Sequence, residues 1–129
     1  MTKRVKIKLN IKPEAIICDV DGTVALMHGN RGPYEWNAVY SDKPNWWVIN
    51  LVKSYLHNNP NTTLIFLSGR SDECYESTYQ WLEDYVMPVK RFSFKLYMRP
   101  VAKLYEKDAD VKYEIYTKLI KPRYDVQFV

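Results

Sequence analysis

The sequence AIICDVDGT at residues 15–23 decides how this chain is interpreted. Three apolar residues lead into Cys18, two carboxylates follow at Asp19 and Asp21, and a Gly-Thr turn comes directly after them. A continuous apolar run that ends in a turn signal is typical of a buried strand in a parallel sheet. Ligands of open parallel sheets bind where the strands end, so both carboxylates are expected in a binding site.

Two carboxylates in this position require an explanation. They repel one another unless a cation or a shared proton relieves the repulsion. An acidic turn after a strand is the simpler interpretation, since Asp and Gly are ordinary turn formers. A buried strand that ends in two acids costs stability, however, which favours a functional use of the pair. The pattern therefore predicts a protein that transfers phosphoryl groups.

Three segments of the chain carry a family resemblance. DVDGT at residues 19–23 resembles the first motif of the haloacid dehalogenase-like phosphatases, in which the first Asp is the nucleophile. RGPYE at residues 31–35 and FLSGR at residues 66–70 narrow the resemblance to the 3′-phosphatase domain of bacteriophage-type polynucleotide kinase/phosphatases. The similarity extends from about residue 14 to the end of the chain, with a short insertion near residues 28–30.

The resemblance assigns catalytic roles. It implies that Asp19 attacks phosphorus and becomes an aspartyl-phosphate, which water then cleaves. Asp21 would protonate the leaving alkoxide and then deprotonate the water. Mg²⁺ is the implied cofactor, bound by Asp19 and the main-chain carbonyl of Asp21, because a hard cation prefers oxygen ligands. Lys112 would neutralise the nucleophile and the phosphate, with Asp108 positioning it; the alternative for these two is a helix-surface ion pair.

The same resemblance implies a set of substrate-binding groups. A threonine hydroxyl and the amides of the first turn would hold phosphate oxygens. A serine hydroxyl and a glycine amide after the second strand would bond the transferring group, although a capping serine is the alternative. An arginine can clamp phosphate oxygens with two hydrogen bonds, against the alternative of a salt bridge. The implied substrate-binding residues are Thr23, Arg31, Ser68, Gly69, Arg70 and Asp108.

The order of apolar patterns predicts an α/β fold. Strands and helices alternate, which gives a three-layer, Rossmann-like (haloacid dehalogenase-like) parallel sheet with helices on both faces. Residues 24–44 read as loop with at most a short helix, so the cap is minimal and the site is open to a bulky substrate. The last strand is expected beside the first, so that Val129 ends near the two acids. The predicted strands are 14–19, 62–67, 92–98 and 124–129, and the predicted helices are 45–59, 71–86 and 108–119, the last with Val111, Ile115 and Leu119 facing inward.

The net charge of +4 is concentrated at the start of the chain, where residues 1–12 carry five basic side chains and no acid. Apolar and polar residues alternate there, which predicts an edge strand whose lysines face water and limit aggregation. A basic arm that attracts a polyanion is the alternative. The expected organisation is therefore a basic amphipathic strand over 1–12 and a phosphatase domain over 13–129.

Several sequence patterns are missing from the chain. It has neither an apolar run long enough to span a membrane nor a signal-peptide core, which predicts a cytoplasmic protein without a membrane partner. It also lacks the GxxxxGK[ST] sequence of the kinase half, so a fused or partner kinase or ligase domain is expected. The family's last motif is an acidic pair after the fourth strand, and the chain is expected to be truncated before it.

The leading interpretation is an Mg²⁺-dependent phosphohydrolase that removes 3′-phosphates from the ends of RNA or DNA in nucleic-acid repair. A small-molecule phosphatase of the same superfamily is one alternative. A module that binds phosphate or nucleic-acid ends without catalysis is another. A receiver domain of a signalling system would place its phospho-accepting Asp after a later strand, which the context of Asp19 does not match.

Overall fold

A four-stranded parallel sheet forms the centre of the protein, and its strand order is β5-β4-β1-β6. The computed structural model describes residues 11–27, 35–86 and 94–129. The strand predicted at residues 1–12 therefore lies, up to residue 10, outside the described residues. The four strands are β1 (Glu14–Cys18), β4 (Thr63–Ser71), β5 (Phe94–Arg99) and β6 (Asp125–Phe128).

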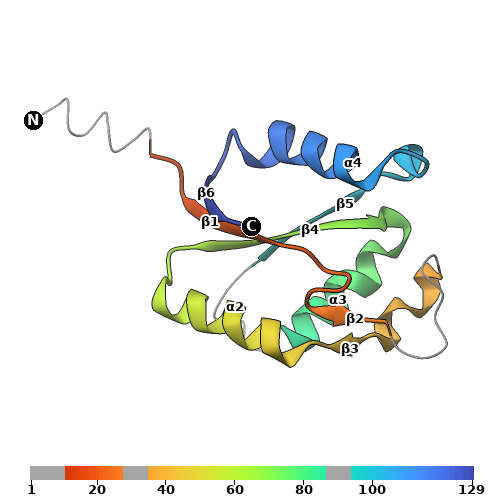
Figure 1. Cartoon of the computed structure of the whole chain (residues 1–129), viewed down its shortest axis with the longest axis horizontal. Coiled ribbons are helices and arrows are strands. Elements are labelled where there is room, and N and C mark those ends of the chain that lie inside the picture. Colours follow the sequence, from red (N-terminus) through yellow and green to blue (C-terminus); the bar gives the residue numbers. More distant parts are fainter. Residues whose placement is uncertain (1–10, 28–34, 87–93) are drawn as a thin grey trace, which may run out of the picture.

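Helices cover both faces of this sheet (Figure 1). Helices α2 (Trp46–Asn58) and α3 (Tyr75–Tyr85) lie on one face, and α4 (Asp108–Ile115) lies on the other. Because side chains alternate along a strand, Ile16 packs into the core beneath α2 and α3, whereas Ile17 packs into the core beneath α4. The predicted three-layer α/β fold is confirmed.

The last strand returns to the side of the first, as the sequence predicts. β6 pairs with β1 in parallel, with Ala15 opposite Val126 and Ile16 opposite Phe128. Strands that run the same way end at the same edge of a sheet, and Val129 and Asp19 indeed line one pocket. The chain visits β4 and β5 on one side of β1 before it crosses to β6, so a crevice is expected at the ends of these strands.

Two sequence predictions about element boundaries are wrong. The strand predicted over residues 62–67 is too short, because β4 continues to Ser71 with a shift in its register against β5 between Ser68 and Ser71. Leu119 does not face the core, because a π-helical turn, η4 (Tyr116–Ile120), follows α4. A π turn holds one residue more than an α turn. Ile120 is therefore fully buried and Leu119 is 38% exposed.

In its described part, the segment between β1 and α2 contains two short strands that were not predicted, besides one short helix. It contains β2 (Ala25–Leu26), the 3-10 helix η1 (Trp36–Ser41) and β3 (Lys43–Pro44). β2 and β3 pair in an antiparallel manner beside α2 and α3 (Figure 1). Strands of two residues are too short to produce an alternating pattern, which explains why the sequence did not indicate them. Within the described residues, no helix has the length and apolarity to cross a membrane.

Candidate active site

The residues after β1 form a tight turn that exposes two carboxylates. The carbonyl oxygen of Val20 accepts hydrogen bonds from three successive backbone N–H groups, at 3.0 to 3.2 Å. Gly22 has a φ of +76°, a conformation that glycine adopts without a steric penalty. Val20 is fully buried, whereas Asp19 and Asp21 on either side of it reach the surface. The DVDGT turn therefore presents both acids at the end of the central strand.

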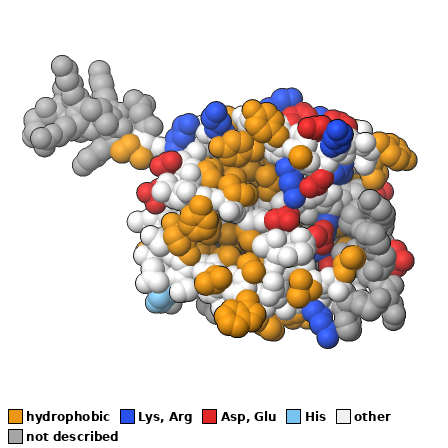
Figure 2. Space-filling model, in the orientation of Figure 1, with side chains coloured by type: hydrophobic (Ala, Val, Ile, Leu, Met, Phe, Trp, Pro, Cys, Tyr) orange, Lys and Arg blue, Asp and Glu red, His pale blue; other side chains and the backbone are white. Residues whose placement is uncertain are grey.

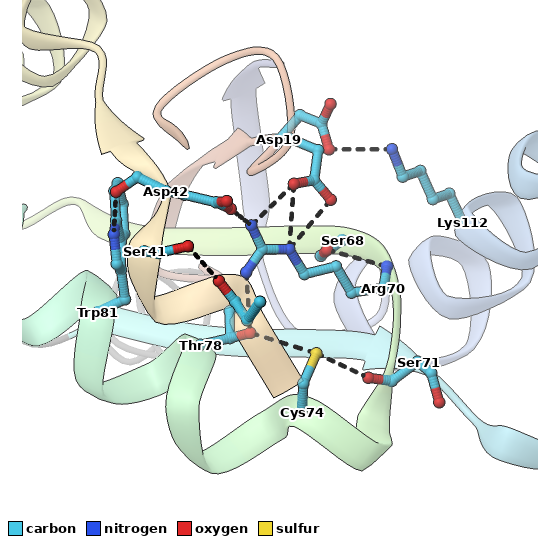
Figure 3. A network of polar contacts seen from close by, with 12 residues as sticks. Asp19, Ser41, Asp42, Ser68, Arg70, Ser71, Cys74, Thr78, Trp81 and Lys112 are labelled. Atoms are coloured by element: carbon cyan, nitrogen blue, oxygen red, sulfur yellow. Dashed lines mark hydrogen bonds and ion pairs between the residues drawn. The ribbon is translucent and has the colours of Figure 1, made fainter. Parts of the chain in front are cut away.

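Lys112 joins the nucleophile candidate to α4. Its Nζ atom lies 3.0 Å from Oδ1 of Asp19 (Figure 3). The same atom lies 3.2 Å from Oδ2 of Asp108. Burial by itself lowers the pKa of Lys112, but hydrogen bonds and charges from Asp19 and Asp108 together raise that pKa above its ordinary value. The lysine is consequently held in its charged form. The structure brings together three residues predicted from the sequence, and the helix-surface pair of Lys112 and Asp108 is part of the same cluster.

Arg99 anchors this cluster, and sequence reasoning missed it. It ends β5 and is only 8% exposed. Its Nη2 atom lies 3.3 Å from Oδ1 of Asp108, and its Nε donates to the carbonyl oxygen of Gly69 at 2.9 Å. The remaining nitrogen donates to main-chain carbonyls within residues 103–106. A basic residue at the end of an otherwise apolar strand was the available signal.

Gly69 has no room for a side chain, because a Cβ atom on it would lie 1.8 Å from Oδ1 of Asp108. We predict that Gly69→Ala displaces the Asp108 carboxylate and loosens Lys112, so that kcat for phosphate release falls by about 10²-fold. Steady-state kinetics check this. In an Asp108→Ala background the same substitution should cost nothing further, because the clash is gone. Equal losses in both backgrounds would contradict the proposed displacement.

Arg70 forms a second, deeper cluster around Asp21. Its side chain is 1% exposed, and its Nε and Nη2 atoms donate to the carboxylate of Asp21 at 2.8 to 3.1 Å. Nη2 also donates to Asp42 at 2.6 Å, and Nη1 donates to Oγ1 of Thr78 at 3.0 Å. Every guanidinium nitrogen thus has a protein partner, as in the salt-bridge alternative (Figure 3). The clamp on a substrate phosphate stays a prediction.

The other predicted substrate-binding residues have different surroundings. Ser68 is fully buried, and its Oγ accepts the backbone N–H of Arg70 at 3.1 Å, as in the capping alternative. Thr23 is half-buried and lines the same pocket as Asp19. Arg31 lies outside the described residues. The contacts of these residues with phosphate remain predictions.

Asp42 is a further residue that sequence reasoning missed. It lies between η1 and β3, in a stretch where Asp is an ordinary turn former. Its side chain is nevertheless 1% exposed and pairs with Arg70. Its main-chain carbonyl accepts the indole N–H of Trp81 at 2.9 Å. No local sequence pattern separates a buried, paired aspartate of this kind from an exposed turn residue.

The donor atoms of the site suit Mg²⁺, for which oxygen ligands and retained waters are typical. Asp19 supplies a carboxylate that is 41% exposed, and the main-chain carbonyl of Asp21 is close in sequence. Figure 2 shows acidic and basic side chains gathered on the face just below α4. The site contains four carboxylates and three cationic side chains, so its net charge is −1. The carboxylates are Asp19, Asp21, Asp42 and Asp108, and the cations are Arg70, Arg99 and Lys112. A bound phosphate would add further negative charge.

A divalent cation would offset that charge. Among the described residues, no three His, Cys, Asp or Glu side chains are grouped so that they could hold a metal ion. The protein ligands in this part of the chain are therefore few, and water would complete the coordination.

The fold and the site together define a class of protein. A parallel sheet, two acids after its first strand and a lysine that reaches the first acid from the last helix are the features of a haloacid dehalogenase-like phosphatase. Residues 13–129 match the family model described as the polynucleotide kinase PNKP phosphatase domain. The chain belongs to this family and is a phosphatase domain.

Individual relatives agree with the family model. The chain is 40% identical over 115 residues to a putative bifunctional polynucleotide kinase/RNA ligase of Autographa californica nuclear polyhedrosis virus, covering 88% of this chain and 16% of that protein. Structures of the Pnkp1/Rnl/Hen1 RNA repair complex and of the Pnkp1/Rnl/Hen1 complex match with TM-scores of 0.77 and 32% identity. The matches cover 91% of this chain and 35% and 38% of those chains. The chain thus spans less than half the length of these relatives.

Proposed function

We propose that this phosphatase removes 3′-phosphates from nucleic-acid ends through an aspartyl-phosphate on Asp19. The observation that carries the proposal is the 3.0 Å contact between Lys112 Nζ and Asp19 Oδ1 at the end of β1. Because the Lys112 cation is fixed beside the Asp19 carboxylate, it can offset the negative charge that an incoming phosphate brings to the nucleophile.

The proposed reaction has two steps. In the first, a carboxylate oxygen of Asp19 bonds to phosphorus, and the bond from phosphorus to the 3′-oxygen breaks while Asp21 gives that oxygen a proton. In the second, Asp21 takes a proton from water, which attacks the aspartyl-phosphate and releases inorganic phosphate. Asp21 is 44% exposed and is held by Arg70, so it reaches the surface in a defined orientation.

Mg²⁺ is the proposed cofactor. The carboxylate of Asp19 and the main-chain carbonyl of Asp21 would hold it, and when bound it would neutralise charge on the transferring phosphoryl group. Lys112 and Arg99 supply the cations that the chain itself places around the nucleophile and its neighbour Asp108.

The proposed substrate class rests on the relatives and on the shape of the chain. One relative is named a polynucleotide kinase/RNA ligase, and the structural matches come from an RNA repair complex. The segment between β1 and α2 forms, in its described part, only β2, η1 and β3, which agrees with the minimal cap expected for a site that admits a polymer end. We further propose that a kinase or ligase domain, fused or separate, acts on the same ends.

A substrate panel tests the proposal. With Mg²⁺ present, the protein should release phosphate from RNA or DNA oligonucleotides with a 3′-phosphate, and far more slowly from 5′-phosphorylated oligonucleotides, nucleotides and sugar phosphates. Brief reaction with ³²P-labelled substrate should leave an acid-stable, hydroxylamine-labile label on the protein, the behaviour of an acyl phosphate. A preference for sugar phosphates would favour a small-molecule phosphatase. Binding of 3′-phosphate ends without turnover would favour a non-catalytic module.

A further inference from the structure

Asp42 is held at both its backbone and its side chain. Its N–H donates to the carbonyl of Val39 at 3.1 Å, and its own carbonyl accepts the indole N–H of Trp81 at 2.9 Å. Its carboxylate lies 2.6 Å from Nη2 of Arg70. A residue between a short 3-10 helix and a two-residue strand is thus fixed as firmly as a core residue.

The burial of this carboxylate is expensive. A buried ion pair is often no more stable than well-packed apolar side chains of the same volume, so its presence is weak evidence for a stabilising role. The pair does fix geometry, because a guanidinium is a rigid planar fork. The Arg70 guanidinium donates from Nη2 to Asp42 and from Nη1 to Thr78, and its Nε donates to Asp21.

Asp21 is the exposed end of this chain of contacts. Its side chain is 44% exposed, whereas the side chains of Arg70 and Asp42 are each 1% exposed. Three hydrogen bonds from Arg70 orient the Asp21 carboxylate from the protein side. Any shift of the Arg70 fork is therefore passed directly to Asp21.

We propose that Asp42 is a positioning residue for the phosphatase reaction, which fixes the fork of Arg70 and through it directs the Asp21 carboxylate at the leaving oxygen. The inference rests on the proposed function, in which Asp21 protonates that oxygen. It links the segment between β1 and α2 to the chemical step through a side chain that is 1% exposed.

The leaving group separates positioning from general damage to the protein. A sugar alkoxide is a poor leaving group and needs its proton, whereas p-nitrophenolate is stable without one. The value of kcat/KM reports on the first irreversible step, the transfer to Asp19. A misplaced Asp21 should therefore lower kcat/KM for a 3′-phosphorylated oligonucleotide and spare kcat/KM for p-nitrophenyl phosphate.

The test compares Asp42→Asn with wild type on both substrates. We expect kcat/KM for the oligonucleotide to fall by about 10²-fold and that for p-nitrophenyl phosphate to change less than about threefold. Asp84→Asn is the matched control, because Asp84 accepts a hydrogen bond from Tyr40 of η1 at the surface of α3. It should leave both values unchanged. In an Asp21→Asn background, Asp42→Asn should cost nothing further.

Equal losses on the two substrates, or an undiminished oligonucleotide rate, would overturn the positioning role. If circular dichroism shows that Asp42→Asn does not fold, Arg70→Lys decides, since it keeps the charge and removes the fork. It should show the same selective loss, and an equal loss on both substrates counts against the inference. A wild-type protein that releases phosphate from neither substrate refutes the proposed function instead, which keeps the two failures distinct.

Discussion

Replacing Asp19 with Asn is expected to reduce phosphate release by about 10³-fold or more. An amide is nearly the same shape as a carboxylate but is a far weaker nucleophile, and it cannot form the aspartyl-phosphate. Asp19 is half-exposed at the end of β1, so the substitution leaves the core unchanged. Phosphate release from a 3′-phosphorylated oligonucleotide measures the loss, and thermal unfolding confirms that the fold persists.

Asp110→Asn is the control for this substitution. Asp110 is also an exposed aspartate and lies two residues before Lys112 on α4, so its replacement should leave the rate within a factor of about two, as is usual away from catalytic groups. If Asp19→Asn kept more than about a tenth of the wild-type rate, the nucleophile would have to be another group.

The second large effect is expected for Lys112→Met. The substitution keeps most of the apolar stem and removes the charge that lies 3.0 Å from Asp19 and 3.2 Å from Asp108. Without it, the carboxylates repel the approaching phosphate and the transferred group loses a fixed cation. We expect kcat to fall by about 10²- to 10³-fold, the range found when one preorganised charge-stabilising donor is removed.

Lys118→Met is a closely matched control on the next turns of the same segment. Lys118 pairs with Glu114 four residues earlier, just as Lys112 pairs with Asp108, but its side chain is 70% exposed. Its replacement should change kcat by less than about twofold, because exposed ion pairs contribute little. Similar losses in the two variants would show that Lys112 acts through the stability of α4 and not on the nucleophile.

The apolar patterns of the sequence determined the sheet and its layers. Alternating burial in β1, with Ile16 on one face and Ile17 on the other, follows from a backbone period of two, which is a local property. The family resemblance implied that Lys112 lies beside Asp19, and the two side chains are 3.0 Å apart in the structure. The catalytic roles of these residues remain predictions until the kinetics are measured.

The tertiary structure alone decided the partners of Arg70 and Arg99. The sequence indicated that Arg70 follows an apolar strand, but whether its guanidinium meets a substrate or Asp42 depends on a segment about thirty residues earlier in the chain. Arg99 and Gly69 likewise acquire their importance from Asp108, which α4 brings against them. Hydrophobic periodicity is a short-range property that sequence displays, whereas a buried charge takes its partner from whatever element the fold places within about 3 Å of it.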